Sequence, residues 1–391
     1  MKRLLIFIPI LFFSSLMQSR ANDDLQVSLL TVMPRSKAVY TIYGHTALRL
    51  YSPSRSIDAV LNWGTFDTGK PNFIYHFLLG ETDYFLSVTS TESFMIFYQI
   101  ENVTVVEQVL DIPDRGKELL LQMVQTNFLP ENIEYRYNIF FNNCTTRPRD
   151  IIEKICGGTL IYPKLEEPVT IRNLVHGCTK HYPWMEFGID LIIGSGADSL
   201  ISVHTEMFLP ERLMDLLGRS FVKTPDSAEY PLIRSSQTIL LSKDNETIKD
   251  RAPFAKPLVV TIIILLIYIC TAIFGFNLRG GVLLFLFAAL AGCIIAAFVF
   301  LSDHPCTSPN WNMLWLHPLH LIGFVGFLYK KQYAVFRWYH GINFTLLSGF
   351  LLGWYWIPQA LNIAFIPLIG CLWLVSGQYL FSRSLCKLTP P

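Results

Sequence analysis

The chain has 391 residues, of which 51% are hydrophobic and 16% are charged. This apolar excess over an ordinary globular protein indicates membrane-spanning segments. The formal net charge is only +1, which argues against nucleic acid as a partner.

The first 21 residues have the features of a secretory signal peptide. Lys2 and Arg3 precede an apolar run over residues 4–13, and residues 19–21 (Ser-Arg-Ala) offer a small-residue cleavage site. We expect the mature chain to begin near Asn22 on the far side of a membrane. A single uncleaved anchor is the less favoured alternative.

Residues 22–218 mix segments of strand and helix periodicity. Strands are expected at 26–33, 45–50, 59–67, 84–89, 103–110 and 189–193, and helices at 93–100, 115–128 and 200–217, the last broken at Pro210. Short turns between successive strands favour antiparallel pairing, so we predict an α+β domain. Residues 219–256 are polar, with one strand-like piece at 238–241, and are expected to form a connector.

One early strand carries a histidine and the next carries an asparagine. Polar and apolar residues alternate from His45 onward, as in a half-buried strand, and the strand at 59–67 contains Asn62. We therefore expect His45 and Asn62 on neighbouring strands. Gly44 allows a close backbone approach just before His45, although any one of the nine histidines is more often structural than catalytic.

A cysteine follows the aromatic run 135–141, at the expected start of a helix. Thr145 and Thr146 are suitable N-cap residues, and Pro148 fits only a first helical turn. A helix N-terminus lowers the pKa of a nearby thiol, and its backbone amides could hold a developing oxyanion. The alternative is that Cys144 is a buried structural cysteine.

The cysteine pattern of the exported part is compatible with one free thiol. Of eight cysteines, three precede the apolar C-terminal part, and if Cys156 pairs with Cys178, then Cys144 remains free. No zinc-type spacing of Cys or His occurs, so we expect neither a metal nor another cofactor.

Cysteine catalysis needs a base and a group that orients the base. His45, Asn62 and Cys144 would supply this set. Papain-like enzymes have the cysteine before the histidine, whereas here the order is reversed. The order therefore predicts a circularly permuted papain-like fold.

Five apolar stretches follow, at residues 257–276, 281–301, 314–328, 341–357 and 362–381. A bilayer core of about 30 Å needs about 20 apolar residues. The first, second and fifth stretches meet that length, and the third and fourth approach it when interfacial aromatic residues are included. We predict a five-helix transmembrane domain over residues 257–391.

Basic residues predict the orientation of these helices. The expected inside segments contain six Lys and Arg residues: Arg279, Lys330, Lys331, Arg337, Arg383 and Lys387. The expected outside loops, 302–313 and 358–361, contain none, in agreement with the positive-inside rule. The exported domain is therefore expected on the same side as loop 302–313.

Residues 43–49, 62–67 and 143–150 together resemble motifs of the Lnb-type lipoprotein N-acyltransferases, and pieces at 194–198, 207–210 and 303–312 are also similar. The resemblance spans nearly the whole mature chain. It implies a periplasmic, permuted papain-like domain followed by a helical domain in the bacterial inner membrane. It also implies transfer of a fatty acyl chain from a membrane phospholipid to the N-terminal cysteine amine of diacylated lipoproteins.

In that family, Cys144 would accept the acyl chain as a thioester and His45 would be the base; Asn62 as the third catalytic member is inferred from its strand. Further side chains are expected to contact substrate: Tyr43, Asn143, Arg147, Asp303, His304 and Trp311. The alternatives are a solvated surface arginine, an ordinary loop turn at 303–304 and an interfacial aromatic belt that includes Trp311.

Two other functions fit part of the same pattern. A membrane-anchored cysteine hydrolase, acting on phospholipids or cell-wall peptides, would share Cys144 and His45. A non-catalytic envelope scaffold would use Cys144 only as a structural residue. Five membrane spans favour a lipid substrate, because a peptidase needs only one anchor.

Overall fold

The computed structural model describes residues 24–35, 39–164, 167–243, 256–273, 279–329 and 333–381. The expected signal peptide and the basic residues Lys330, Lys331, Arg383 and Lys387 lie outside these ranges. The chain divides into two compact units, one formed by residues 1–169 and 200–247 and the other by residues 170–199 and 248–391.

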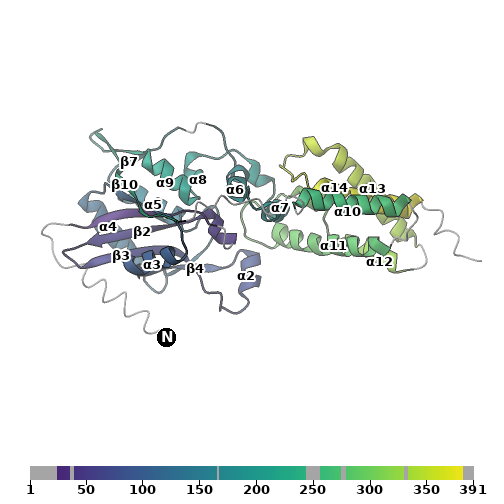
Figure 1. The fold of residues 1–391 in the computed structure, drawn as a ribbon, viewed down its shortest axis with the longest axis horizontal. Coiled ribbons are helices and arrows are strands. Elements are labelled where there is room, and N and C mark those ends of the chain that lie inside the picture. Colours follow the sequence, from purple (N-terminus) through teal and green to yellow (C-terminus); the bar gives the residue numbers. More distant parts are fainter. Residues whose placement is uncertain are drawn as a thin grey trace, which may run out of the picture. The chain divides into compact units, whose positions relative to one another are not determined.

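The first unit contains strands and helices in alternation (Figure 1). Its strands are β1 (Gln26–Val32), β2 (His45–Ser52), β3 (Ile57–Thr65), β4 (Asp83–Ser90), β5 (Val105–Leu110), β6 (Glu134–Arg136), β7 (Thr159–Ile161), β8 (Phe221–Lys223), β9 (Glu229–Pro231) and β10 (Ile233–Leu240). Its helices are the 3-10 helix η1 (Val39–Tyr43), α2 (Phe73–Leu79), α3 (Thr91–Ile100), α4 (Asp114–Asn127), α5 (Thr146–Ile155), α8 (Val203–Glu206) and α9 (Pro210–Gly218). The mixture of antiparallel sheet and helices confirms the expected α+β class.

A seven-stranded antiparallel sheet organises this unit, in the order β10-β5-β1-β2-β3-β4-β6. Strands β7, β8 and β9 form a second, three-stranded sheet. Part of the expected connector 219–256 is therefore strand, because it contains β8, β9 and β10. Strand β10 lies at the sheet edge and most of its residues are exposed, so only its end, within the piece 238–241, looks like a strand in the sequence.

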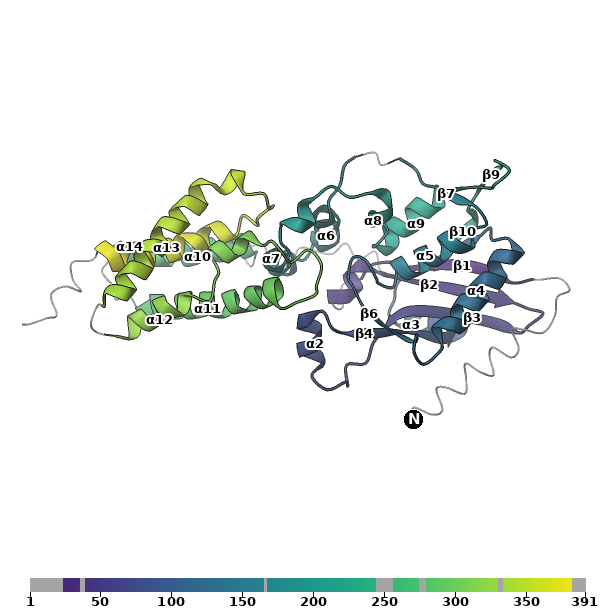
Figure 2. The same cartoon turned by 180° about the vertical axis from the view of Figure 1, so that it is seen from behind.

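Helices cover both faces of the large sheet (Figures 1 and 2). On one face, a core cluster combines sheet residues with Leu120 of α4, Ile152 of α5 and Leu213 of α9, all fully buried. On the other face, Phe94 of α3 packs in a smaller cluster with Val60 of β3 and other sheet residues. The helices expected at 93–100 and 115–128 thus cover opposite sides of the sheet.

The second unit is helical. Its elements are α6 (Ile171–Thr179), α7 (Pro183–Ile192), the 3-10 helix η2 (Ser195–Asp198), α10 (Pro257–Ile273), α11 (Arg279–Phe300), the 3-10 helix η4 (Trp311–Leu314), α12 (His320–Leu328), α13 (Ala334–Leu352), the 3-10 helix η5 (Trp354–Trp356) and α14 (Phe365–Phe381). Helix α14 packs against α10 and α13, and α11 packs against α12 (Figure 2).

The long helices of this unit differ in their capacity to cross a bilayer. Among the described residues, only Gly281–Phe300 in α11 is both long enough and apolar enough to do so, and α10 and α14 are shorter apolar helices. Helix α12 has nine residues, a length of about 14 Å at 1.5 Å per residue. Of the third expected span, 314–328, only the last nine residues form this helix, and the five-span arrangement stays a prediction.

Residues 189–193 were expected to form a strand, and this prediction is wrong. They lie in and just after α7, which begins at Pro183 in the first helical turn. Phe187 and Leu191, four residues apart, pack together against the apolar core of the second unit. A five-residue run that is apolar except for Asp190 and is bounded by glycine does not distinguish a strand from the end of a helix.

Candidate active site

The structure places His45 and Asn62 on adjacent strands. Strand β2 begins at His45 and pairs with β3, and His45 Nε2 lies 3.3 Å from Asn62 Oδ1. The Asn62 amide donates to the Val60 carbonyl at 3.4 Å, which turns its oxygen toward the ring. Because Asn62 Oδ1 accepts from Nε2, the Nδ1 atom of His45 is left for proton exchange with a thiol.

Asn143 caps the helix that follows the nucleophile. Its Oδ1 accepts hydrogen bonds from the backbone N–H of Thr145 at 2.7 Å and of Thr146 at 2.9 Å, while its Nδ2 donates to the carbonyls of Ile139 and Phe208 at 2.7 and 3.0 Å. The side chain is buried and all its hydrogen-bonding capacity is used.

Asn143 was expected to contact substrate; its amide fixes the loop that carries Cys144, and the substrate contact stays a prediction. One expectation is corrected by this arrangement. Thr145 and Thr146 were expected to cap α5 with their side chains; instead their backbone amides are bound by Asn143. Those two amides are therefore not available to hold an oxyanion.

The sulfur of Cys144 is half-buried and lies within hydrogen-bonding reach of the His45 ring. The Thr46 backbone N–H also donates to it, and the Thr145 hydroxyl lies 3.8 Å away. Strand β3 passes directly beside it at Gly64, which has a φ of +93°. A Cβ at position 64 would lie 3.2 Å from the Cβ of Cys144, so glycine suits both the backbone and the space.

The electrostatics of the pair favour a thiolate and an imidazolium. Burial raises the pKa of Cys144, but the charge of His45 and the hydrogen bonds from His45, Thr145 and Thr46 outweigh it and lower the pKa overall. Burial likewise lowers the pKa of His45, and the Cys144 charge with the hydrogen bonds of Cys144 and Asn62 raises it overall. A thiolate beside an imidazolium is the reactive form of a catalytic cysteine.

Three tyrosines that sequence reasoning missed surround the thiol. Tyr84, Tyr135 and Tyr137 all sense the Cys144 charge, and the rings of Tyr84 and Tyr137 stack at 4.0 Å. Burial, then the nearby sulfur, raises the pKa of Tyr84 to about 12, so its phenol stays neutral. The pairing of β4 with β6 places Tyr84 opposite Tyr135, a register that no local pattern in the sequence reveals.

The expected contact residues near Cys144 differ in accessibility. The guanidinium of Arg147 lies 3.9 Å from the ring centre of Tyr135, and its Nε donates to Asn142 Oδ1 at 2.7 Å. Its terminal nitrogens bond no acceptor among the described residues, so the substrate contact expected of Arg147 stays a prediction. Tyr43, at the end of η1 and half-buried, remains a prediction.

Cys156 carries a thiol and does not pair with Cys178. It is fully buried, and its sulfur donates to the carbonyls of Glu153 at 3.3 Å and Gly158 at 3.4 Å. The sequence allowed a disulfide between Cys156 and Cys178 that would leave Cys144 as the free thiol. Cys144 is free without that disulfide.

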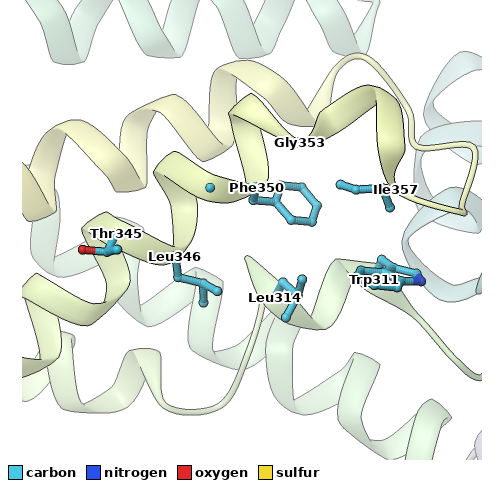
Figure 3. Close-up of a pocket in the computed structure, with 8 residues that line it drawn as sticks. Trp311, Leu314, Thr345, Leu346, Phe350, Gly353 and Ile357 are labelled. Atoms are coloured by element: carbon cyan, nitrogen blue, oxygen red, sulfur yellow. The ribbon is translucent and has the colours of Figure 1, made fainter.

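Asp303, His304 and Trp311 lie in the second unit, and their substrate contacts stay predictions. The backbone N–H of Trp311 donates to Gln359 Oε1 at 2.8 Å. The Trp311 side chain lines an apolar cavity of about 380 Å³ together with Leu314 and residues of α13 (Figure 3). The His304 ring lies 5.8 Å from that of Phe298.

Two groups of carboxylates with a histidine have spacings that suit a metal ion: Asp150, Glu153 and His204, and His176, Glu186 and Asp190. In both, side chains already have protein partners, since Arg149 pairs with Asp150 and Arg172 pairs with Asp190. A cation beside either arginine would be repelled.

Comparison with known families agrees with this organisation. The model of the Lnb N-terminal periplasmic domain matches residues 14–177, and the model of the Lnb transmembrane domain matches residues 249–384. No curated protein and no solved structure matches the chain. The chain therefore belongs to the Lnb family, whose domains indicate a lipoprotein-processing enzyme of the membrane.

Proposed function

We propose that this protein is a lipoprotein N-acyltransferase that carries the acyl chain as a thioester on Cys144. The observation that supports it most is the Cys144–His45 pair, whose mutual charge and hydrogen bond favour the thiolate over the thiol. The membrane domain of the same chain supports a lipid as the acyl donor. The acceptor is the α-amine of a diacylated lipoprotein's first cysteine.

In the first half-reaction, the thiolate of Cys144 attacks an ester carbonyl of the phospholipid. The sulfur–carbon bond forms, the carbon–oxygen ester bond breaks, and the imidazolium of His45 gives its proton to the leaving alkoxide. The products are an acyl-thioester and a lysophospholipid. Asn62 holds the ring during this transfer through the bond at 3.3 Å.

In the second half-reaction, the lipoprotein amine attacks the thioester. An α-amino group has a pKa of about 7.7–8.0, so a useful fraction is neutral near pH 7. The carbon–nitrogen bond forms, the Cys144 thiolate leaves, and neutral His45 accepts the proton lost by the amine. Water must be excluded meanwhile, because it would hydrolyse the thioester.

The test is reconstitution of the full chain in liposomes with a diacylated lipopeptide. Mass spectrometry should detect a lipopeptide with one added amide-linked acyl chain, and Cys144→Ala should abolish it. Cys156→Ala is the matched control, because it removes a buried thiol whose hydrogen bonds go only to backbone carbonyls. Release of free fatty acid with unchanged lipopeptide would instead identify a phospholipase, and slow thiol labelling of Cys144 would favour a scaffold.

A further inference from the structure

Helix α2 of the first unit presents an unusual amount of apolar side chain to solvent. None of its seven residues is buried, and Ile74, Tyr75 and Phe77 are 81%, 59% and 42% exposed. The helix is well formed, because Gly80 closes it in the left-handed conformation and donates to the carbonyls of His76 and Phe77. Contiguous exposed apolar surface on a folded domain marks an interaction site.

This surface is connected to the nucleophile by aromatic rings. Four stacked contacts lead inward from α2: Phe77 to Phe73 at 6.3 Å, Phe73 to Phe66 at 5.8 Å, Phe66 to Tyr84 at 4.9 Å, and Tyr84 to Tyr137 at 4.0 Å. The last two rings are those that sense the Cys144 charge. The exposed face is therefore continuous with the catalytic site.

The loop before Cys144 adds a second apolar edge. Ile139 and Phe141 are 37% and 51% exposed. The backbone N–H of Tyr137 donates to the carbonyl of Thr82 at 3.2 Å, which holds the start of this loop beside the segment that follows α2. Both views of the fold draw α2 next to β4 (Figures 1 and 2).

Charges border this face but do not enter it. The only titratable residue in α2 besides Tyr75 is His76, which lies 3.1 Å from Glu81. Lys70 pairs with Glu134 at 2.8 Å and Arg136 pairs with Asp83 at 3.0 Å, on the elements that flank the helix. An apolar centre with a charged rim suits the interface of a bilayer, where the apolar face enters the acyl region and the charges stay in water.

We propose that α2, together with Ile139 and Phe141, docks into the lipid surface of the bilayer and guides a phospholipid acyl chain along the ring series to Cys144. The membrane is the favoured occupant because the chain carries its own membrane domain. It is favoured also because the face leads to a thiol whose substrate is a lipid. This second reason rests on the proposed acyltransferase function. The docking of α2 to lipid can be true even if that function is wrong.

Photo-crosslinking of the full chain in liposomes tests the docking alone. Benzoylphenylalanine would replace Ile74, and the liposomes would contain a phospholipid with an alkyne-tagged acyl chain. The same probe at Ile100 of α3, which is 74% exposed, is the matched control. We expect at least five-fold more tagged lipid on position 74. Equal yields, or crosslinks from position 74 only to the protein itself, would overturn the proposal.

A double variant, Ile74→Ser with Phe77→Ser, tests the guiding role. We expect acyl transfer from liposomes to fall at least ten-fold, while alkylation of Cys144 by a small soluble reagent keeps its wild-type rate. Ile100→Ser should transfer normally. Wild-type transfer by the double variant would overturn the guiding role. If the wild-type protein crosslinks lipid at position 74 but transfers no acyl chain, the proposed reaction fails and the docking surface stands.

Discussion

At the scale of single residues, the reactivity of Cys144 depends on two opposing effects. Burial favours the neutral thiol, whereas the imidazole of His45 and hydrogen bonds from Thr145 and Thr46 favour the thiolate. The neighbours prevail only while His45 is present, since its charge and its hydrogen bond are the two largest effects that lower the pKa.

His45→Ala should therefore raise the Cys144 pKa above the ordinary thiol value, because burial then acts with less opposition. Each unit of increase lowers the thiolate fraction at neutral pH about ten-fold. In the wild-type protein, alkylation should stay fast well below the ordinary thiol pKa and should fall as pH drops through the lowered pKa. Iodoacetamide rates measured from pH 4 to 10 give both profiles. Superimposable profiles would refute the pairing of the two side chains.

Asn62 is expected to act by orienting His45. Asn62→Ala removes the bond at 3.3 Å, and because that bond raises the His45 pKa, the imidazolium should lose its proton at lower pH. We expect acyl transfer to fall by about 10- to 100-fold, which corresponds to a lost hydrogen bond to a charged group of about 1.5–3 kcal/mol.

The pH profile of transfer separates this role from a structural one. A positioning residue should shift the alkaline limb of the profile to lower pH while the thermal unfolding temperature changes little. An unchanged profile in an Asn62→Ala protein of low stability would indicate that Asn62 serves only the packing of β3.

At the scale of elements, the start of α5 is set by one amide side chain. Asn143→Ala removes the cap of two backbone N–H groups, and loss of an N-cap costs about 0.5–2 kcal/mol of stability. Asn143→Asp keeps the accepting oxygen and loses the donations to Ile139 and Phe208. We expect both variants to lower the thermal unfolding temperature and the alkylation rate of Cys144. Asn143→Ala acts by removing the cap, and Asn143→Asp acts by releasing the loop that carries Cys144. Unchanged values for both would refute the positioning role.

The sequence predicted those parts of the site that depend on local pattern. Alternation placed His45 and Asn62 on paired strands, and the helix signals placed Cys144 just before α5. The cap by Asn143 was not predicted, because Thr145 and Thr146 are also suitable N-cap residues and stand closer to the start of the helix. The tyrosines around the thiol depend on the register of β4 with β6, which is fixed only by tertiary packing.

At the scale of the whole molecule, residues 170–199 belong to the helical unit and not to the domain expected over 22–218. Arg172, near the start of this segment, is 1% exposed. It donates to Asp190 at 2.8 Å, to Asp198 at 2.7 Å and to the carbonyls of Ile193 and Gly194 at 3.0 Å. No charge run or motif in the sequence predicts this buried hydrogen-bond network around Arg172.

The same segment is held by amide side chains from distant loops. Asn310 donates to the carbonyls of Leu191 and Ile192, Asn312 donates to that of Asp190, and Gln359 donates to that of Ile193. These residues lie more than 100 positions from their partners in the sequence. The stretch around 310–312, predicted as part of a substrate-contacting loop, thus also fixes the end of α7.

Arg172→Met should destabilise the protein strongly, because it leaves buried Asp190 without its guanidinium partner. Removal of one member of a buried ion pair costs about 3–5 kcal/mol. Arg234→Met is the matched control, since its pair with Asp111 is exposed and such pairs contribute about 0–1 kcal/mol. Thermal unfolding in detergent measures both. Equal effects of the two substitutions would show that the Arg172 network contributes little.

The division of the chain has a practical consequence for making fragments. The polypeptide passes from the first unit to the second after residue 169, returns after 199 and leaves again after 247. No single stop codon or protease site can therefore yield either unit intact. A truncation at residue 256 would leave α6, α7 and η2 in the fragment but remove the loops that bind them. A separable catalytic fragment therefore needs residues 170–199 replaced by a short linker.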